Sequence, residues 1–360
     1  MKHRGFRFHA LSVGVMVALL AGCATPGALP QRAGSIALAP GGLLAMTTPR
    51  YAAMPQQPDL GRSWMDPSAK TIKELLYISD HHTNDVYVYD YKSGRAVGKL
   101  TGFHDPYGQC VDAKGDVWVA NFSGFSVVEY AHGGSRPIKK LSTNGHAIGC
   151  SVAPQGDLSV ANMTTPSGAG DIQLWKNASG TPSSYSNAQY CYYLWPPGDD
   201  NYGNMFVETD ATNYACELYY GGSQGLMTGN SPFGRSTIDF PGGSMWDGQY
   251  LTFTDQEYGG GSTTAVYQTL EVPCGGLTVI GTTVLKDTCH GTDVDVVQPF
   301  VVGTSNTPVN GTQGMVVVGG NLSCHHRFDY WSYPAGGNPA KTLKSAPQEP
   351  YGASVSIASR

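Results

Sequence analysis

The sequence is poor in charge and above all in basic residues. Charged side chains make up 14% of the 360 residues, and 22 Lys and Arg stand against 27 Asp and Glu, which gives a formal net charge of −5. Binding to a nucleic-acid backbone needs a stripe of Lys and Arg that neutralises phosphates, and the chain has no such stripe. We therefore expect no nucleic acid among its partners.

Long apolar runs and common catalytic motifs are also scarce. The N-terminal apolar run, residues 10–22, is too short for a stable membrane-spanning helix. The chain has neither the phosphate-binding G-x-x-x-x-G-K-[ST] loop nor the zinc-binding H-E-x-x-H motif. What it has in abundance is 47 Gly, 23 Pro and 21 Tyr. This composition favours many short strands joined by glycine turns.

The N-terminus has the pattern of an export signal. Lys2, Arg4 and Arg7 precede the apolar run, and the run ends in Leu-Ala-Gly-Cys at residues 20–23. Residues 20–23 resemble the lipobox of bacterial lipoproteins, which implies cleavage before Cys23 and attachment of lipid to its thiol and new amino terminus. The alternative is an ordinary export signal with an incidental cysteine. Ala24 replaces the Asp that retains enterobacterial lipoproteins in the inner membrane, which favours the outer membrane or cell surface.

Three segments follow from composition and periodicity. We expect residues 1–22 to be a lipoprotein signal peptide and residues 23–72 to be the lipidated cysteine with a flexible tether. The tether is expected because residues 24–70 are rich in Ala, Gly, Pro, Gln and Thr and show no sustained period. We expect residues 73–360 to form the folded part.

Short apolar strands recur through this folded part. Their starts are separated by 41, 41, 47, 46 and 65 residues, and the strands are 75–80, 116–121, 157–162, 204–209, 250–255 and 315–320. A second strand follows each of them, most are followed by a glycine turn and a more polar strand, and most are preceded by a strand that a Gly announces. Four short strands at this period indicate a β-propeller blade, which buries its faces only against neighbouring blades. We predict an all-β fold, a six-bladed propeller of four-stranded antiparallel blades.

The two ends of the folded part predict how the ring closes. EPYGASVSIAS at residues 349–359 matches DPYGQCVDA at 105–113, where an inner strand begins, while the first blade lacks an inner strand of its own. We expect the C-terminal segment to supply that strand, because closure removes the exposed strand edges.

The repeat also resembles a known group. PYGQCVDAKGDVWVANFSGFSVVEYA, residues 106–131, is similar to an NHL-type or YncE-like propeller repeat, and the likeness covers about residues 73–360. This broad superfamily includes the lactonases of the senescence-marker-protein/gluconolactonase family. The matching motifs specify blades and not a reaction, since propellers carry many unrelated functions.

The topology of a blade brings two sets of side chains to one face of the ring. In a four-stranded meander, the start of the inner strand and the turn between the second and third strands lie on the same face. The first set, at the pore mouth, is His104, Asp105, Tyr107, His146, His290, Glu349 and Tyr351. The second set, at the turns, is Asp80, His81, His82, Asn121, Asn162, Asp210, Asp255 and Asn321, with His325 and His326 before the third strand of the last blade.

Each set has a functional and a structural interpretation. Together they predict a polar funnel with histidines that binds a ligand, holds a metal or transfers protons. Alternatively, Asp and Asn at the turns bond the backbone two residues on, and the histidines bond carbonyls of neighbouring blades. The resemblance to the lactonases implies a divalent cation held by a Glu, an Asn and an Asp, for which the chain offers Glu349, Asn121 or Asn162, and Asp255. The Glu that this family places near the start of the domain has no counterpart.

Seven cysteines remain after Cys23 in a chain that we expect to be exported, where disulfides persist. Cys110 and Cys150 occupy equivalent positions in successive inner strands, and we expect them to be separate buried side chains because neighbouring blades splay apart. Pairs are possible between Cys191 and Cys216, which share a blade, and among Cys274, Cys289 and Cys324.

The sequence thus favours a lipid-anchored propeller that acts as a binding platform for a small molecule or an envelope protein, with its membrane contact through the lipid on Cys23. Two enzymatic alternatives remain: a metal-dependent, lactonase-like hydrolase, whose divalent metal would be the one cofactor, or a lyase that uses a pore-mouth His with an acid such as Glu349. A purely structural envelope component is the third alternative.

Overall fold

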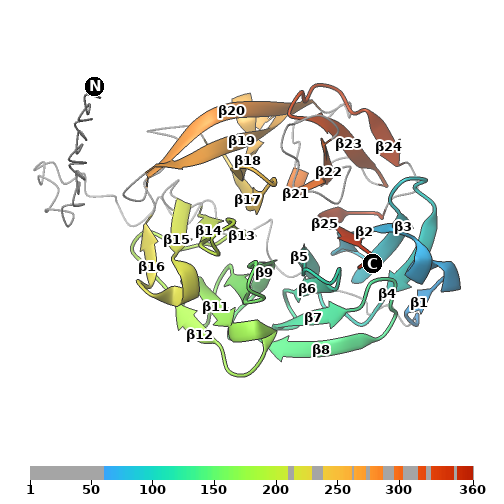
Figure 1. Ribbon diagram of the computed structural model, residues 1–360, viewed down its shortest axis with the longest axis horizontal. Coiled ribbons are helices and arrows are strands. Elements are labelled where there is room, and N and C mark those ends of the chain that lie inside the picture. The colour runs from blue at the N-terminus through green and yellow to red at the C-terminus, as the bar shows by residue number, and fades with distance from the viewer. Residues whose placement is uncertain are drawn as a thin grey trace, which may run out of the picture. The chain divides into compact units, whose positions relative to one another are not determined.

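The computed structural model describes residues 61–209, 215–228, 238–261, 263–272, 276–286, 296–302, 315–321, 326–343 and 347–359. All of them belong to the second of the two units into which the chain divides, Tyr51–Arg360. Their strands form six antiparallel sheets, which are arranged as blades around a central axis (Figure 1). The all-β propeller predicted from the strand period is confirmed.

The blades follow one another in chain order around the ring. From its inner strand outward, blade 1 contains β25 (Pro350–Ile357), β2 (Glu74–Asp80), β3 (Asp85–Asp90), β4 (Ala96–Leu100) and β1 (Trp64–Met65). In the same direction, blade 2 contains β5 (Pro106–Val111), β6 (Val117–Asn121), β7 (Ser126–Tyr130) and β8 (Pro137–Ser142). Blade 3 contains β9 (Ala147–Val152), β10 (Leu158–Asn162), β11 (Asp171–Trp175) and β12 (Ser183–Tyr185).

The second half of the ring repeats this plan. Blade 4 contains β13 (Gly198–Asp199), β14 (Met205–Glu208), β15 (Ala215–Leu218) and β16 (Leu226–Thr228). Blade 5 contains β17 (Pro241–Trp246), β18 (Leu251–Glu257), β19 (Thr263–Val272) and β20 (Gly276–Lys286). Blade 6 contains β21 (Val296–Val302), β22 (Met315–Asn321), β23 (Phe328–Tyr333) and β24 (Lys341–Leu343).

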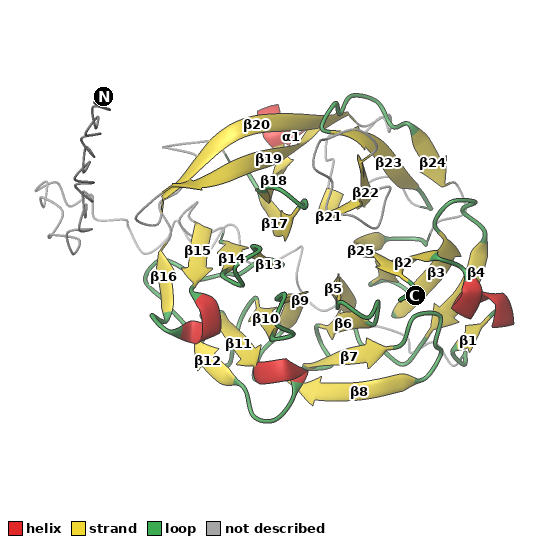
Figure 2. Ribbon diagram, viewed as in Figure 1, coloured by secondary structure: helices red, strands yellow, loops and turns green. Residues whose placement is uncertain are grey.

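Helical turns are few and lie at the periphery of the ring, as Figure 2 shows. In the part of the chain that the structure describes they are η2 (Pro67–Thr71), η3 (Lys176–Ala178), η4 (Tyr220–Gly222) and α1 (Tyr258–Gly261). None of the described helices is long and apolar enough to cross a membrane.

The burial of the strands explains their composition. Every residue of β6 and β10 is buried, because a middle strand packs both of its faces against neighbouring blades. Such strands are nearly continuous apolar runs rather than alternating ones. The outer strand β8 is instead exposed or half-exposed along its length and carries two lysines. In these blades the strands are therefore buried and apolar in the middle of the sheet and more polar and exposed at its outer edge.

The C-terminal strand closes the ring as predicted. Strand β25 pairs antiparallel with β2, from Glu74 opposite Ile357 to Asp80 opposite Pro350. At the other edge of this sheet, β1 pairs with β4, with Trp64 opposite Lys99. Residues 61–72, which composition assigns to the tether, therefore include an outer strand of blade 1, and the fold begins before Lys73.

The described residues form two disulfides, and one corrects an expectation from the sequence. Cys110 of β5 and Cys150 of β9 are bonded across neighbouring blades with their Cα atoms 5.5 Å apart. The expectation of separate side chains was wrong because blades splay apart only toward the rim, whereas their inner strands converge on the axis. Cys191 and Cys216 form the second bond, one of the pairs that the sequence left open. Cys274, Cys289 and Cys324 lie outside the described residues.

Candidate functional site

The register of the blades places the two predicted sets of residues on one face. In blades 1 and 2 the first residue of the inner strand lies opposite the last residue of the second strand, Pro350 with Asp80 and Pro106 with Asn121. Both the turn that follows the second strand and the segment that precedes the inner strand therefore open on the same mouth of the pore. Blades 1 and 2 bring five side chains together there, which we call the funnel site: His81, Asp105, Tyr107, Glu349 and Tyr351.

His81 is the centre of the funnel site. It follows the last residue of β2, and its ring lies between two carboxylates that precede the inner strands of blades 1 and 2. Its Nε2 is 2.8 Å from Oε2 of Glu349, and its Nδ1 is 3.6 Å from Oδ1 of Asp105. The first distance is that of a charge-assisted hydrogen bond, whereas the second is longer than a hydrogen bond. Both ring nitrogens thus face an acceptor, which suits the doubly protonated imidazolium.

The surroundings of His81 favour its charged form. Burial of the ring acts to lower the pKa of His81, but the contact with and charge of Asp105, together with the charges of Glu349 and Asp80, outweigh burial and raise the pKa above its ordinary value. The side chains of His81 and Glu349 are 22% and 21% exposed, so the pair remains accessible to a ligand. The exposed His82 lies farther from this carboxylate, with Nδ1 3.9 Å from Oε1 of Glu349.

Asp105 is held in place by an unusual backbone conformation. Its φ of 62° lies in the left-handed region that non-glycine residues seldom adopt. Its N–H donates to Oδ1 of Asn84 at 2.6 Å, and Oγ of Ser123 donates to its Oδ2 at 3.3 Å. The turns of blades 1 and 2 therefore fix this carboxylate toward His81, at the cost of local strain.

Two aromatic rings that contact each other lie on one side of His81. The ring centroids of Tyr107 and Tyr351 are 4.1 Å apart, and they lie 6.0 Å and 5.7 Å from that of His81. Tyr107 and Tyr351 occupy equivalent positions at the starts of β5 and β25, so the internal repeat explains why they meet.

The row of rings continues into blades 2 and 3. Phe122 stacks on Tyr107 with a centroid distance of 4.6 Å, and His146 stacks on Phe122 at 4.6 Å. Phe125 packs on His146 at 4.6 Å and is 44% exposed. Phe122 and Phe125 were not predicted as site residues, although the F-S-G-F that follows β6 places both in the turn of blade 2 on the funnel face.

Most of the other turn residues serve the scaffold. The Oδ1 atom of Asp80 accepts the N–H groups of His82 and Thr83, and its Oδ2 accepts that of Gln348. The remaining members bond backbone or side-chain groups at the same turns: Asn121 accepts from the N–H of His104, Asp255 accepts from the N–H groups of Phe240 and Glu257, and Asn162 donates to Asn144, Asp171 and Gln173. Their chemistry is that of turn-forming residues.

Several predicted site residues do not join the funnel site. His104 is exposed, and so is His326, whose N–H donates to the carbonyl of Gln348. His146 belongs to the row of rings, with Nδ1 3.3 Å from the carbonyl oxygen of Phe122. Four predicted residues lie outside the described residues: Cys23, Asp210, His290 and His325; the side chain of Asn321 is likewise not described.

One motif in the chain has the spacing of a hydrolase nucleophile elbow, G-x-S-x-G, at residues 221–225. The structure places Ser223 in an exposed turn between β15 and β16, beside the single turn of η4. A nucleophile elbow needs a strand that turns sharply into a helix, so this match carries no catalytic function.

A group of carboxylates lies at the opposite end of the pore. Among the described His, Cys, Asp and Glu residues, Asp112, Asp116 and Glu129 form a group whose ligand atoms lie within 4.8 Å of one another. Oδ1 of Asp112 already accepts two backbone N–H groups of its turn, and Glu129 lies 3.8 Å from the ammonium of Lys139. These contacts are those of a tight turn, and among the described residues neither Glu349 nor Asp255 belongs to such a group.

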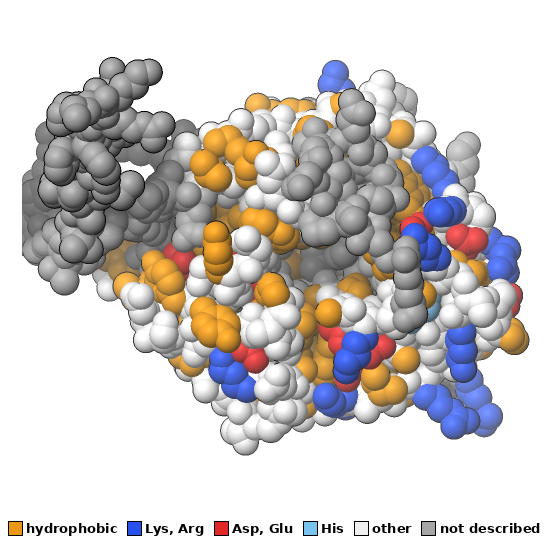
Figure 3. Space-filling view, in the orientation of Figure 1, with side chains coloured by type: hydrophobic (Ala, Val, Ile, Leu, Met, Phe, Trp, Pro, Cys, Tyr) orange, Lys and Arg blue, Asp and Glu red, His pale blue; other side chains and the backbone are white. Residues whose placement is uncertain are grey.

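On the face shown in Figure 3, Lys and Arg side chains are separate groups interspersed with acidic ones and form no continuous basic patch.

Comparisons with known proteins identify the fold and nothing finer. No family model matches the chain, and no curated protein matches it.

Solved structures do match. A protein of unknown function from Bacteroides caccae is 12% identical with a TM-score of 0.55, over 79% of this chain and 99% of that one. A chain of the nidogen/laminin complex is 11% identical with a TM-score of 0.56, over 80% of this chain and 100% of that one. At such identities the likeness establishes the β-propeller and leaves the function to the site.

Proposed function

We propose that the protein is an exported, lipid-anchored β-propeller that binds a partner of the cell envelope at the funnel site. The observation that carries the proposal is the geometry of His81, whose two ring nitrogens face Glu349 and Asp105 and whose ring lies beside the contacting rings of Tyr107 and Tyr351. A rigid ring that presents accessible charged side chains from the loops at one mouth of its pore is a typical recognition surface.

The arrangement favours binding over acid–base catalysis. A general base needs a nitrogen that can accept a proton from substrate, and both nitrogens of His81 are directed at carboxylates. The imidazolium offsets one of the two negative charges, which leaves acceptor oxygens beside aromatic faces. Such a surface suits a ligand with hydrogen-bond donors next to an apolar or flat face, such as a saccharide of the envelope or a side chain of an envelope protein.

Export and anchoring rest on the N-terminal segment and gain support from the cysteines. Structural disulfides persist in oxidising compartments, and the described part of the chain has two. The structural neighbour from the nidogen/laminin complex supports a propeller that acts as a protein-binding platform. Labelling of cells with a fatty-acid analogue should mark the full chain and should not mark a Cys23→Ser variant; equal labelling of both would exclude the anchor at Cys23.

Site-specific photo-crosslinking tests the binding proposal. A photoreactive phenylalanine replaces Phe125, which is 44% exposed beside the funnel site, and, as a control, Ile138, which is 54% exposed on the outer strand β8. We expect an adduct only at position 125, and its intact mass will distinguish a protein from a saccharide. The adduct should be lost when Tyr107 is also changed to Ala. Absence of an adduct at position 125, or equal adducts at both positions, would contradict the proposal.

Metal-dependent hydrolysis remains the second proposal, supported by the resemblance of the repeat. Elemental analysis of the untagged chain that begins after Cys23 tests it. One stoichiometric divalent metal that is lost in Glu349→Ala and His290→Ala variants would favour the enzyme, whereas a metal-free protein would exclude the lactonase mechanism.

A further inference from the structure

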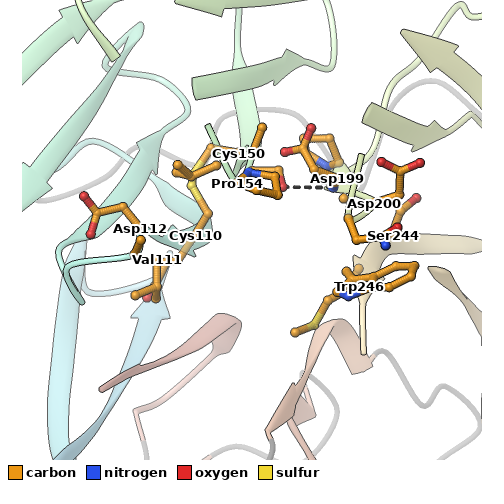
Figure 4. Close-up of a pocket in the computed structure, with 18 residues that line it drawn as sticks. Cys110, Val111, Asp112, Cys150, Pro154, Asp199, Asp200, Ser244 and Trp246 are labelled. Atoms are coloured by element: carbon orange, nitrogen blue, oxygen red, sulfur yellow. Dashed lines mark hydrogen bonds between the residues drawn. A yellow bond between two sulfur atoms is a disulfide. The ribbon is translucent and has the colours of Figure 1, made fainter. Parts of the chain in front are cut away.

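The pore holds a cavity of about 390 Å³ at the end opposite the funnel site. Inner strands of blades 2 to 5 line it, together with the disulfide of Cys110 with Cys150 (Figure 4). Two carboxylates of the lining, Asp112 and Asp200, already accept N–H groups of their own turns. These carboxylates are paired within the fold, so they select no ligand. The outer rim of the ring is different.

The outermost strand of a blade exposes unpaired N–H and C=O groups. Proteins protect such an edge from another chain by shortness, charge, proline or a covering segment. Five of the six described blades end in a protected strand. Strands β12, β16 and β24 have three residues each, and β1, which covers β4 of blade 1, has two. Strand β8 has six residues, but it begins with Pro137 and carries Lys139 and Lys140.

Strand β20 of blade 5 is the exception. It has 11 residues, lies on the outer rim of the ring in Figure 1 and is the last strand of its sheet, after β19. It contains no proline, and its one charged residue is the last, Lys286. Its first seven residues, 276–282, read G-L-T-V-I-G-T. An uncharged segment rich in β-branched residues is of the kind that pairs with other strands.

The other half of β20 is already covered by a turn of blade 6. The N–H of Gly337 donates to the carbonyl of Val284, and the N–H of Lys286 donates to the carbonyl of Gly337, each at 2.8 Å. None of the described residues bonds to the outer side of residues 276–282, which we call the open edge. The open edge is therefore available to a further strand.

The open edge belongs to a two-stranded extension of blade 5. Strand β18 pairs with β19 only from Ala265 to Thr269, so residues 270–272 and 276–278 continue without a third strand. Two strands alone are marginally stable in water, and a further strand stabilises them. Leu270 and Ile280 are each 48% exposed there. Ile280 is the extra residue of a bulge, which places an apolar side chain in solvent where other edges carry a charge.

These properties fit a second copy of the same chain. A two-fold axis places an antiparallel edge against itself, so any charge on the edge would face a like charge. The open edge has no charge, and an axis at Val279 would bring Ile280 of both copies beside it. We propose that the protein forms a symmetric dimer in which the open edges of two copies pair antiparallel and join their fifth blades into one sheet. Because the funnel site lies at the pore mouth of blades 1 and 2, this dimer leaves both funnel sites accessible.

Sedimentation velocity of the full chain tests the proposal. Between about 1 µM and about 100 µM the natural protein should shift from the monomer toward a species of twice its mass. Ile280→Lys places like charges beside the axis and should raise the dissociation constant at least tenfold. The matched control is Ile138→Lys, which adds the same charge at an isoleucine that is 54% exposed on β8 and should change the constant less than threefold.

Hydrogen exchange locates the contact without a variant. The outward-facing amide protons of the open edge should exchange at least tenfold more slowly at the higher concentration than at the lower one, whereas those of β8 should exchange equally at both. Three results would each overturn the proposal: a chain that stays monomeric at about 100 µM, an Ile280→Lys variant that dimerises like the natural protein, or an open edge whose exchange does not depend on concentration.

Discussion

The disulfide of Cys110 with Cys150 should contribute about 4 kcal/mol to the free energy of unfolding. The bond joins the inner strands of two neighbouring blades and closes a loop with a sequence separation of 40, which contains the whole of blade 2 beyond its inner strand. The chain-entropy model assigns about 3.9 kcal/mol at 25 °C to a closed loop of this length. The loss is a large fraction of the net stability of a typical domain, about 5–15 kcal/mol, so the unbridged protein should unfold at a much lower urea concentration.

The assay compares Cys110→Ala, Cys150→Ala and the double variant by reversible urea unfolding. Each single variant breaks the bond, so all three should lose nearly the same free energy, between about 2 and 5 kcal/mol. If the two cysteines acted only as buried apolar side chains, the losses of the single variants would add in the double variant. Additive losses, or a loss below about 1 kcal/mol, would refute the reasoning.

Three further perturbations test other parts of the fold. The pKa of His81 is raised in the folded protein, so its ion pair stabilises the fold fully at pH values below the unfolded pKa of about 6.5. This stabilisation is lost as the pH rises through the folded pKa. The urea midpoint of the natural protein should therefore fall over that pH window, and the midpoint of His81→Gln should not. Glu208 is fully buried, and burial raises its pKa well above the ordinary value. The free energy of unfolding of the natural protein should therefore decrease as the pH rises above about 4.5, and Glu208→Gln should reduce this decrease. The same decrease with pH in Glu208→Gln would contradict the assignment. Gly115→Ala should lower the free energy of unfolding by about 1–3 kcal/mol, because φ is 87° at this position and the added Cβ would collide with the carbonyl oxygen of Ile357. A variant that unfolds at the same temperature as the natural protein would disprove the collision.

The ring could be predicted from the sequence because the repeat is itself the structural unit. The apolar runs 75–80, 116–121 and 157–162 became β2, β6 and β10 with ends that differ by at most one residue. The C-terminal match to a blade start predicted the pairing of β25 with β2. Both inferences depend on local pattern and on the need to bury two faces of every blade, which sequence expresses directly.

The distances between residues of neighbouring blades could not be predicted from the sequence. The shared face of His81, Asp105 and Glu349 followed from topology, but their distances depend on how closely the inner strands approach the axis. The same approach joined Cys110 to Cys150, which were expected to stay apart. The inner strand of blade 4 could not be located from the sequence because it is only two residues long, Gly198–Asp199.

Burial decides which part of the funnel face a partner can reach. His81 and Glu349 are 22% and 21% exposed, whereas Tyr107, Phe122 and Tyr351 are buried and Phe125, at the far end of the row of rings, is 44% exposed. The buried rings therefore position the site, and a partner would contact the His81–Glu349 pair and the exposed end of the row. This is why the photoreactive residue belongs at position 125, and why a partner that binds there should also respond to His81→Gln.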